Sequence, residues 1–280
     1  MWKWKSENGS LSLREREGAP FLVFRNLEET HLVRHGFSTR QGGVSEGDLA
    51  SLNLGFTRGD EPERVRENFR RIGAAIGFDC ASLVLSDQTH TTNVRRMTED
   101  DRGKGFSREQ DYTDVDGMIT DVPGLTLATF YADCVPLFFV DPVHRAIGLS
   151  HSGWKGTVHR MGAVTLRRMC EEFGTEPGDV IAAIGPSICQ DCYEVSEDVA
   201  SQFLQEFGDD ADERMLYQKE NGKYQLNLWR ANETVLLAAG IREEHLAVTN
   251  LCTCCNPQLL FSHRASGGRR GNLGAFLQLL

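Results

Sequence analysis

Short apolar runs separated by turn-forming residues characterise the middle of the chain. Their lengths and their β-branched and aromatic residues are typical of strands buried on both faces. These runs lie at 83–86, 117–120, 125–131, 136–140, 146–150 and 180–185. Helical periodicity alternates with them, at about 61–76, 157–173, 196–207 and 229–239. The alternation predicts an α/β fold built around a sheet core.

The chain has the features of one domain. Its 280 residues can bury a sizeable core, and no repeat, low-complexity tract or obvious linker divides them. We therefore predict a single domain over residues 1–280. Because the first residues are polar, we expect residues 1–18 to form a peripheral N-terminal extension.

Composition and charge narrow the class of protein. A content of 40% hydrophobic and 25% charged residues is ordinary for a globular protein. The formal net charge of -10 gives no general attraction to nucleic acid or to an anionic membrane. No apolar run approaches the ~18 residues of a membrane span, and the amino terminus lacks the apolar stretch of a signal peptide. We expect a cytoplasmic protein with reduced cysteines and with neither a nucleic acid nor a membrane as partner.

His90, Cys134 and His151 are the strongest indication of chemistry in the sequence. Each stands at or just past the end of an apolar run, which is the edge at which α/β proteins build their sites. Two imidazoles and one thiolate would fill three of the four positions around zinc and leave one for water or substrate, as in catalytic zinc sites. The alternative is a buried thiol with two hydrogen-bonded histidines, because the three residues form no local chelating motif.

Two basic residues lie in loops that suit an anion. Lys155 precedes a predicted helix that starts at about Thr157, and a helix amino terminus attracts phosphate. Arg40 lies in a Ser-Thr-Arg-Gln-Gly-Gly turn, where a guanidinium can bind phosphate or carboxylate in a fork. Both residues also fit the pattern of ordinary solvated side chains. Asp133, next to Cys134, is a candidate for proton transfer, with a purely structural carboxylate as the alternative.

The carboxy-terminal segment FSHRASGGRRG allows two interpretations. It places basic side chains among glycines, and these residues are His263, Arg264, Arg269 and Arg270. They form either a second loop that faces an anion or a solvated basic turn. From the residues alone, the solvated turn is the simpler prediction.

The remaining clustered cysteines also allow two interpretations. Two short segments contain them, Cys189-Gln-Asp-Cys192 and Cys252-Thr-Cys254-Cys255. They could supply a second, all-thiolate zinc site. We expect buried thiols instead, because Cys192 and Cys252 lie beside apolar segments, where a small buried thiol is common.

Several longer strings occur together and in a consistent order. They are HGFSTRQGGVS, SLNLG, QTHTTNV, DGMITDVPG, ADCVPLFFVDP, SHSGWKGT, IGPSI, CYEV, LCTCCNP and FSHRASGGRRG. With these strings the chain resembles the laccase-domain (YfiH-type) family, formerly labelled polyphenol oxidase, whose members are regarded as zinc-dependent purine nucleoside phosphorylases. The resemblance extends from about residue 35 to the last apolar run.

The resemblance implies a fold, an activity and a site. The fold would be a layered sandwich of mixed β-sheets flanked by helices. The activity would be phosphorolysis of adenosine, inosine and guanosine, with phosphorolysis of S-methyl-5'-thioadenosine and deamination of adenosine. The metal ligands of the family fall on His90, Cys134 and His151, and its other motifs bring Arg40, Lys155 and Arg264 near them.

Two other functions compete with this prediction. The first is a copper-dependent polyphenol oxidase, the older family label. A multicopper centre needs about ten histidines, partly as His-x-His pairs, whereas this chain has 8 histidines and no such pair. A single site of two histidines and one cysteine could still take copper in place of zinc. The second is a non-catalytic protein that binds nucleosides, which turnover of inosine with phosphate would exclude.

Overall fold

Two six-stranded mixed sheets form the centre of the protein, in a computed structural model that describes residues 2–6 and 9–280. The first sheet has the order β1 (Leu11–Arg16), β2 (Ala19–Phe24), β3 (Val33–Ser38), β15 (Leu273–Leu279), β7 (Thr126–Tyr131) and β4 (Leu83–Leu85). The second has the order β14 (Leu246–Val248), β10 (Ile181–Ile184), β8 (Val135–Asp141), β9 (Ala146–Ser152), β6 (Gly117–Thr120) and β5 (Val94–Arg96). Only the pairs β4–β7, β10–β14 and β5–β6 are parallel among these strands.

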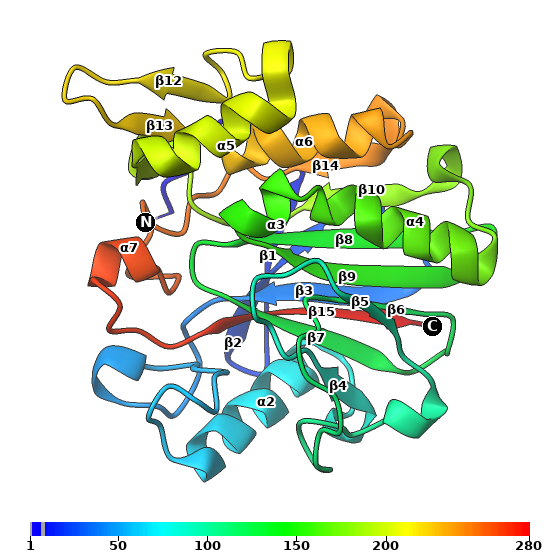
Figure 1. The fold of residues 1–280 in the computed structure, drawn as a ribbon. Helices are drawn as coiled ribbons and strands as arrows, with labels where there is room; N and C mark the ends of the chain where they lie inside the picture. Colours follow the sequence, from blue (N-terminus) through cyan, green and yellow to red (C-terminus); the bar gives the residue numbers. More distant parts are fainter. Residues whose placement is uncertain (1, 7–8) are drawn as a thin grey trace.

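A small sheet and short to medium helices surround the two large sheets. The small sheet is antiparallel, in the order β11 (Glu194–Val195), β13 (Tyr224–Leu226) and β12 (Leu216–Gln218). The helices are α1 (Arg25–Glu28), α2 (Pro62–Ile76), α3 (Trp154–Val158), α4 (Met161–Phe173), α5 (Glu197–Phe207), α6 (Leu228–Ala238) and α7 (His263–Ser266). In Figure 1, α2 lies below the first sheet, whereas α4 and α6 lie above the second.

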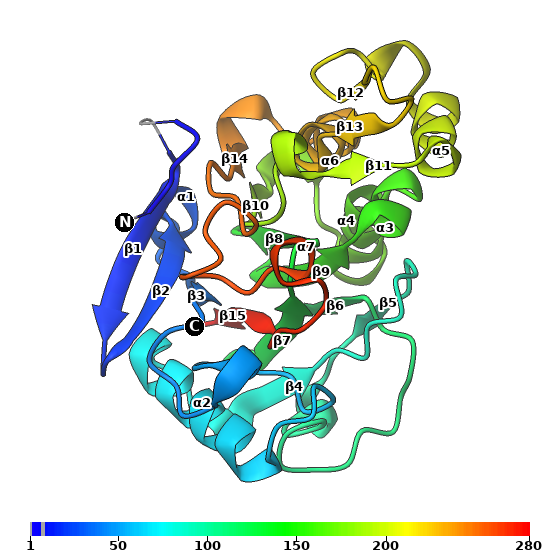
Figure 2. The same cartoon turned by 90° about the vertical axis from the view of Figure 1, so that its left-hand side faces the viewer.

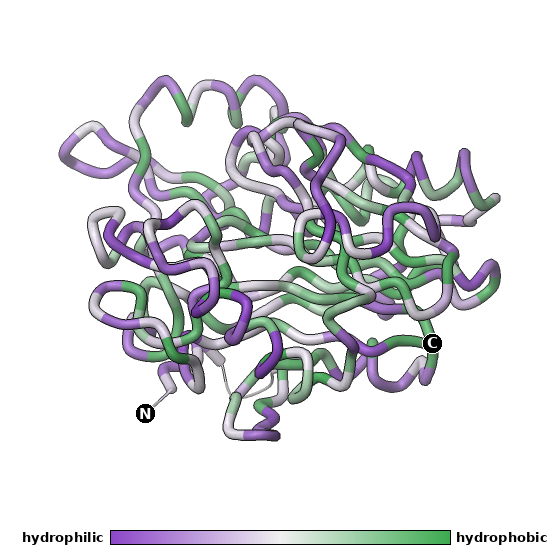
Figure 3. Tube along the Cα trace, turned by 90° about the horizontal axis from the view of Figure 1, so that it is seen from below, coloured by the Kyte–Doolittle hydropathy of each residue, from purple (hydrophilic) through white to green (hydrophobic). Residues whose placement is uncertain are grey.

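The two large sheets pack face to face, and each is covered by helices on its outer face. Successive side chains of a strand point to opposite faces, so a strand buried on both sides reads as a continuous apolar run. In β15, Leu277 packs into the core between the sheets, and Phe276 packs into the core beneath α2. In β8, Phe138 faces the first of these cores, and Phe139 faces the core beneath α4 and α6. The colouring of Figure 3 shows the hydrophobic strands inside and hydrophilic segments around them.

This arrangement confirms the predicted fold class, a layered sandwich of mixed sheets flanked by helices. The helix expected at about 61–76 is α2, and those expected at 196–207 and 229–239 are α5 and α6. The helix expected over 157–173 is wrong in its bounds. It is two helices, because Arg160 adopts a left-handed backbone with φ 55° and separates α3 from α4. The first of these begins at Trp154, three residues before the expected start.

The amino-terminal segment lies at the border of the first sheet. Its strand β1 pairs with β2 along its whole length and has no neighbour on its other side within the described chain. Farther upstream, the backbone of Lys5 donates to the carbonyl of Asn250, beside β14. None of the described helices combines the length and the apolar composition of a membrane-spanning segment.

Candidate metal centre and its two cavities

His90, Cys134 and His151 meet at one end of the two sheets. Cys134 lies in the turn between β7 and β8, and His151 lies in β9, paired with Pro136 of β8. His90 lies in the loop that follows β4. The ligand atoms of the three residues all lie within 4.8 Å of one another. This end of the sheets is on the left in Figure 1 and faces the viewer in Figure 2, near α7.

The buried carboxylate of Asp116 organises both histidines. Its Oδ1 lies 2.8 Å from Nδ1 of His151, which leaves Nε2 of that ring to face Cys134 and a metal. The same carboxylate accepts hydrogen bonds from the backbone N–H groups of Thr89, His90 and Thr91. Asp116 therefore fixes the tautomer of one histidine and the position of the loop that bears the other.

The charges of Cys134 and His151 support each other. Burial raises the pKa of the Cys134 thiol, but His151 and hydrogen bonds from both imidazoles outweigh burial and lower that pKa to about 6. Burial lowers the pKa of His151, whereas Cys134 and Asp116 outweigh it and raise that pKa to about 9. Both shifts favour the thiolate of Cys134 and the imidazolium of His151, and a metal cation would take the place of the proton. A donor set of one thiolate and two imidazoles fits a tetrahedral zinc ion with one open position.

The backbone around the trio is strained and crowded. His90 has φ 67° and Asp133, next to Cys134, has φ 91°, both in the left-handed region that costs energy for residues other than glycine. At Gly153, an added Cβ would lie 3.1 Å from Sγ of Cys134 and 3.2 Å from Cδ2 of His90. A glycine is required there for space, since its φ of -71° suits any residue.

A first cavity of about 390 Å³ opens on one side of the trio. His90, Cys134 and His151 line its floor. Its walls combine hydrogen-bonding side chains with aromatic rings, and they include Arg58, Asp87, Gln88, Arg270, Asn272, Phe56, Phe130 and Tyr131. The cavity therefore offers both charged and apolar contacts within reach of the candidate metal.

Two guanidinium groups, those of Arg58 and Arg270, line the first cavity together with the carboxylate of Asp87. Neither Arg58 nor Arg270 forms an ion pair within the part of the chain that the structure describes. Burial and the charge of Arg58 together lower the pKa of Arg270 to about 10. Two unpaired cations at short range favour the entry of an anion between them.

A second cavity of about 380 Å³ adjoins the first and shares His90, Cys134 and Arg270 with it. Its walls are more apolar and aromatic, and they include Trp154, Ile188, Tyr193, Leu228, His263 and Arg264. A flat, partly aromatic wall with a few polar groups is typical of sites for heteroaromatic ligands. His90 and Cys134 thus line both cavities, which differ in character.

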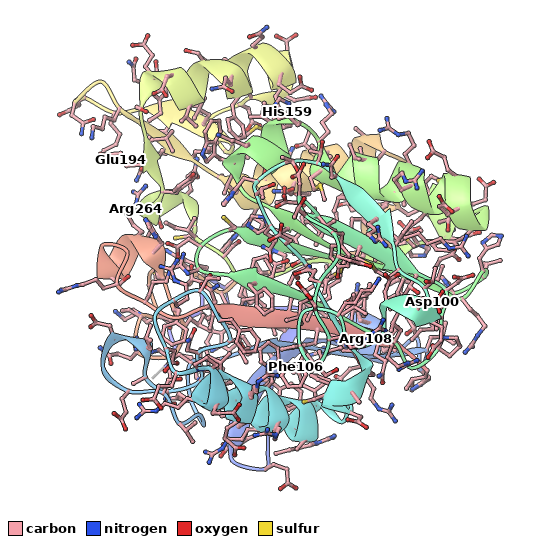
Figure 4. The ribbon with its side chains drawn as sticks, turned by 60° about the horizontal axis from the view of Figure 1, so that its bottom comes forward. Asp100, Phe106, Arg108, His159, Glu194 and Arg264 are labelled. Atoms are coloured by element: carbon pink, nitrogen blue, oxygen red, sulfur yellow. The ribbon has the colours of Figure 1, made fainter. Side chains whose placement is uncertain are left out.

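Hydrogen bonds of Asp133 and Arg264 connect the segments that form the wall of the second cavity. The carboxylate of Asp133 accepts from the hydroxyl of Thr253 at 2.6 Å and from the backbone N–H of Arg264 at 2.7 Å. The guanidinium of Arg264 donates to the carbonyls of Cys192 and Glu194 and lies over the ring of Tyr193. Figure 4 shows Arg264 beside Glu194 at this end of the molecule.

The structure does not bring Arg40 or Lys155 into either of these cavities. Nε and Nη1 of Arg40 donate to the carbonyls of Ala50 and Pro257, and its guanidinium lies over Phe261. Arg40 lines a separate cavity, which Arg270 also borders. Lys155 is exposed, with Nζ 5.7 Å from the ring centroid of Trp154.

The helix start expected at about Thr157 is wrong, because α3 begins at Trp154. The N–H of Thr157 is not a free donor, because it already donates to the carbonyl of Gly153 inside α3. Within the carboxy-terminal segment, His263, Arg264 and Arg270 border the cavities beside the trio, whereas Arg269 borders the separate one.

Three residues contribute to the site without a signal in the sequence that predicts their role. Asp116 stands in the DGMIT string, but its partner His151 is 35 residues away in the chain. Arg58 lies in an ordinary Thr-Arg-Gly-Asp turn, and Tyr193 in the string CYEV. The strings of the family resemblance contained two of these residues without indicating what they do.

The chain is similar to proteins of known name and structure. It is 39% identical over 246 residues to the purine nucleoside phosphorylase YlmD of Bacillus subtilis, covering 86% of this chain and 87% of that protein. It is 32% identical over 237 residues to the adenosine deaminase RL5 from an unknown prokaryotic organism, covering 84% and 90% of the two chains. The crystal structure of the hypothetical protein YfiH of Bacillus licheniformis matches it with a TM-score of 0.88 at 32% identity, over 96% of this chain and 99% of that one.

The family profile described as multi-copper polyphenol oxidoreductase laccase matches residues 34–280. This match includes every residue of the metal trio and of both cavities beside it. Relatives that align with 84–90% of this chain carry the names of purine nucleoside phosphorylases and of an adenosine deaminase. The chain is therefore an enzyme of the laccase-like, YfiH-type family.

Proposed function

We propose that this protein is a purine nucleoside phosphorylase that cleaves adenosine, inosine and guanosine with phosphate to the free base and ribose 1-phosphate. The same site would cleave S-methyl-5'-thioadenosine and deaminate adenosine. The observation that carries the proposal is that His90 and Cys134 line both a cavity with two unpaired arginines and an adjoining cavity with an aromatic wall. A phosphorolytic enzyme needs a site for an anion and a site for a purine on opposite sides of C1' of the ribose, because the C1'–O bond to phosphate forms as the C1'–N bond to the base breaks.

The purine would occupy the second cavity. Trp154 and Tyr193 supply aromatic surface for a base, and the side chains of His263 and Arg264 supply polar groups at its edge. The carboxylate of Asp133 accepts a hydrogen bond from the backbone N–H of Arg264 and so holds Arg264 in place at the wall of the cavity. The proton-transfer role that the sequence suggested for Asp133 is retained as a proposal, although both of its oxygens already accept hydrogen bonds.

Phosphate would occupy the first cavity, held by Arg58 and Arg270. Two guanidiniums can present donors to phosphate oxygens and neutralise its charge. Phosphorolysis passes through an oxocarbenium-like sugar, so its rate depends on holding the phosphate against the face opposite the departing base. Arg40 and Lys155, predicted from the sequence, remain proposed contributors from the neighbouring surface. The apolar residues Phe56 and Phe130 could accept the methylthio group of methylthioadenosine.

Zinc is the proposed metal at His90, Cys134 and His151, with copper as a substitute. When bound, zinc would supply a Lewis acid for a substrate atom and a lowered pKa for water, the latter serving deamination. The residues of the chain do the remaining work. Asp116 holds His151 in the ligating tautomer, and Gly153 leaves room beside Cys134.

An oxidase with several coppers is not favoured by the side chains. Within the described residues, two groups of three or more histidine, cysteine or acidic residues have metal-binding geometry, and only one contains histidine. That group has two histidines, too few for a mononuclear and a trinuclear copper centre. We propose that the protein acts in the cytoplasm on small molecules, without nucleic acid or membrane partners.

The test is chromatography of reactions with adenosine, inosine and methylthioadenosine, with and without phosphate. We expect wild-type protein to release hypoxanthine from inosine only when phosphate is present, and Cys134→Ala to lose this activity together with its site metal. Release of base without phosphate would indicate a hydrolase. Tight nucleoside binding without turnover would instead support the non-catalytic alternative and overturn the proposal.

A further inference from the structure

A second group of metal-binding side chains lies outside the site described above. It consists of Cys189, Cys192, Cys252 and Cys255, whose sulfur atoms all lie within 4.8 Å of one another. The topology explains why two Cys-x-x-Cys segments meet. The neighbouring strands β10 and β14 are parallel, so the chain leaves both of them at the same edge of the sheet. The pairing continues through a bridge between Ser187 and Cys252.

The distances between the sulfurs match those around a single ion. Sγ of Cys255 lies 3.9 Å from Sγ of Cys189 and 3.5 Å from Sγ of Cys192. Four thiolates at about 2.3 Å from a tetrahedral zinc lie about 3.8 Å from one another. The same spacing leaves no room for a cluster of several irons and sulfides. All four cysteines are free thiols rather than disulfides.

The surroundings of the sulfurs suit a group with negative charge. Sγ of Cys252 accepts from the backbone N–H of Cys189 at 3.2 Å and from that of Cys255 at 3.4 Å. A zinc ion with four thiolates carries a net charge of about -2, and backbone donors of this kind stabilise it. The ammonium of Lys5 forms an ion pair with Asp191 at 2.7 Å, and it also interacts electrostatically with Cys189 and Cys255.

We propose that Cys189, Cys192, Cys252 and Cys255 bind a structural zinc ion as four thiolates. Cys189 and Cys252 are buried, and the other two are partly buried, so the ion has no open position for a substrate. This inference replaces the sequence-based expectation of simple buried thiols. It does not depend on the proposed enzymatic activity, because no residue of the first metal site belongs to this group.

The ion would brace the wall of the second cavity. Tyr193, which lines that cavity, directly follows Cys192. Thr253, which donates to Asp133, directly follows Cys252. Crosslinking the two segments through a metal holds both contacts in place, although the segments are 63 residues apart in the chain. The structural zinc would therefore affect activity only through the shape of the cavity.

Metal analysis of cysteine variants tests the proposal. All variants are made in a Cys254→Ser background. Cys254 lies in the same segment as two of the proposed ligands but does not belong to the group, and its thiol could otherwise replace a ligand that has been removed. We expect two zinc ions per chain in wild type and in this background. Adding Cys192→Ser or Cys255→Ser should remove one of them and lower the thermal midpoint. An unchanged zinc content in these variants would overturn the assignment.

A measurement on Cys134→Ala covers the case in which the serine variants do not fold. This variant should lose the zinc of the first site and keep the other ion. X-ray absorption at the zinc edge should then show only sulfur neighbours at about 2.3 Å. Nitrogen or oxygen neighbours, a metal-free protein, or a disulfide within the group in peptide maps would each refute the proposal. Loss of activity with the all-sulfur signal intact would concern the first site alone.

Discussion

Oδ1 of Asp116 lies 2.8 Å from Nδ1 of His151, and both side chains are buried. The relationship links two parts of the metal centre that come from different elements. Asp116 immediately precedes β6, and His151 lies in the adjacent strand β9. The same carboxylate holds the backbone of the loop that carries His90. One buried acid thus determines the geometry of two of the three candidate ligands.

Replacing Asp116 by asparagine should weaken zinc binding at the trio by roughly 10- to 100-fold. The amide would present N–H donors to His151 and favour the tautomer in which Nε2 carries the proton. That tautomer has no lone pair at Nε2 for the metal. Competition with a chromophoric chelator measures the affinity.

The matched control for this variant is Asp114→Asn. Asp114 contacts the hydroxyl groups of Thr89 and Thr91 in the same loop but not the ring of His151. We expect near wild-type zinc affinity from it. Equal losses in the two variants would attribute the effect to the loop rather than to the tautomer.

Gly153→Ala should weaken zinc binding through crowding alone. The new methyl group would lie 3.1 Å from Sγ of Cys134. Overpacking costs about 1–3 kcal/mol, which corresponds to a roughly 5- to 100-fold loss of affinity if the ligands must move. In the control Gly156→Ala, the nearest atom would lie at 3.5 Å, an ordinary contact. A chelator titration that gives the same affinity for both variants would contradict this explanation.

The layers of the fold could be predicted because their signals are local. Apolar runs such as PLFFV indicated strands buried on both faces. The helix α2 could be predicted because its apolar residues recur at helical spacing along one face. The break between α3 and α4 could not be predicted, since no glycine or proline marks Arg160 as left-handed. The N-terminal strand β1 was also missed. It is half exposed and gains its partner only from the hairpin with β2.

The site shows the same division between local and distant signals. The trio could be found from strand ends, but the role of Asp116 depends on which strand lies next to β9. The cysteine group depends on the parallel pairing of β10 with β14, which spans an intervening sheet and two helices in the chain. The expectation that Arg40 and Lys155 lie near the trio rested on loop chemistry, which does not specify the direction of a side chain, and neither residue lines the two cavities beside the trio.

The stability of the protein should fall with pH below neutrality because of His35. Burial lowers the pKa of this side chain to about 3, from an ordinary value of 6.5. Its Nε2 accepts from the backbone N–H of Phe24 at 2.8 Å, so the folded protein requires a neutral ring. The unfolded chain binds the proton as pH falls below 6.5, and stability is lost from there toward pH 3.

Between pH 7 and pH 5, His35 alone should cost about 2 kcal/mol of unfolding free energy. Urea unfolding at several pH values measures the loss, and His35→Gln is the comparison. Glutamine can accept the hydrogen bond from the backbone N–H of Phe24 but does not titrate, so the stability of the variant should depend less on pH. The difference between the two curves isolates His35 from metal loss. Parallel curves would show that His35 does not control the acid sensitivity.

Arg270→Met should reduce phosphorolysis of inosine more than deamination of adenosine. Phosphorolysis needs a bound anion as nucleophile, whereas deamination uses water. Loss of a charge-assisted contact costs about 1.5–3 kcal/mol, which corresponds to a roughly 10- to 100-fold fall in kcat/KM when the contact is made in the transition state. Arg58→Met should behave similarly, because the two guanidiniums line the same cavity. Both rates can be measured on one preparation of each variant by following base and inosine.

Lys155→Met tests which of two proposed phosphate sites is used. One is the cavity lined by Arg58 and Arg270, and the other is the loop of Lys155 suggested by the sequence. Lys155 is exposed beside Trp154, outside the walls of both cavities next to the trio. Its removal should therefore cause a smaller selective loss of phosphorolysis than Arg270→Met. The fall should shrink further at high salt, because the charge of an exposed lysine is screened. If Lys155→Met reduced phosphorolysis more selectively than Arg270→Met does, the phosphate site would have to be assigned to the start of α3. Equal losses of phosphorolysis and deamination would instead place Lys155 at the purine or the ribose.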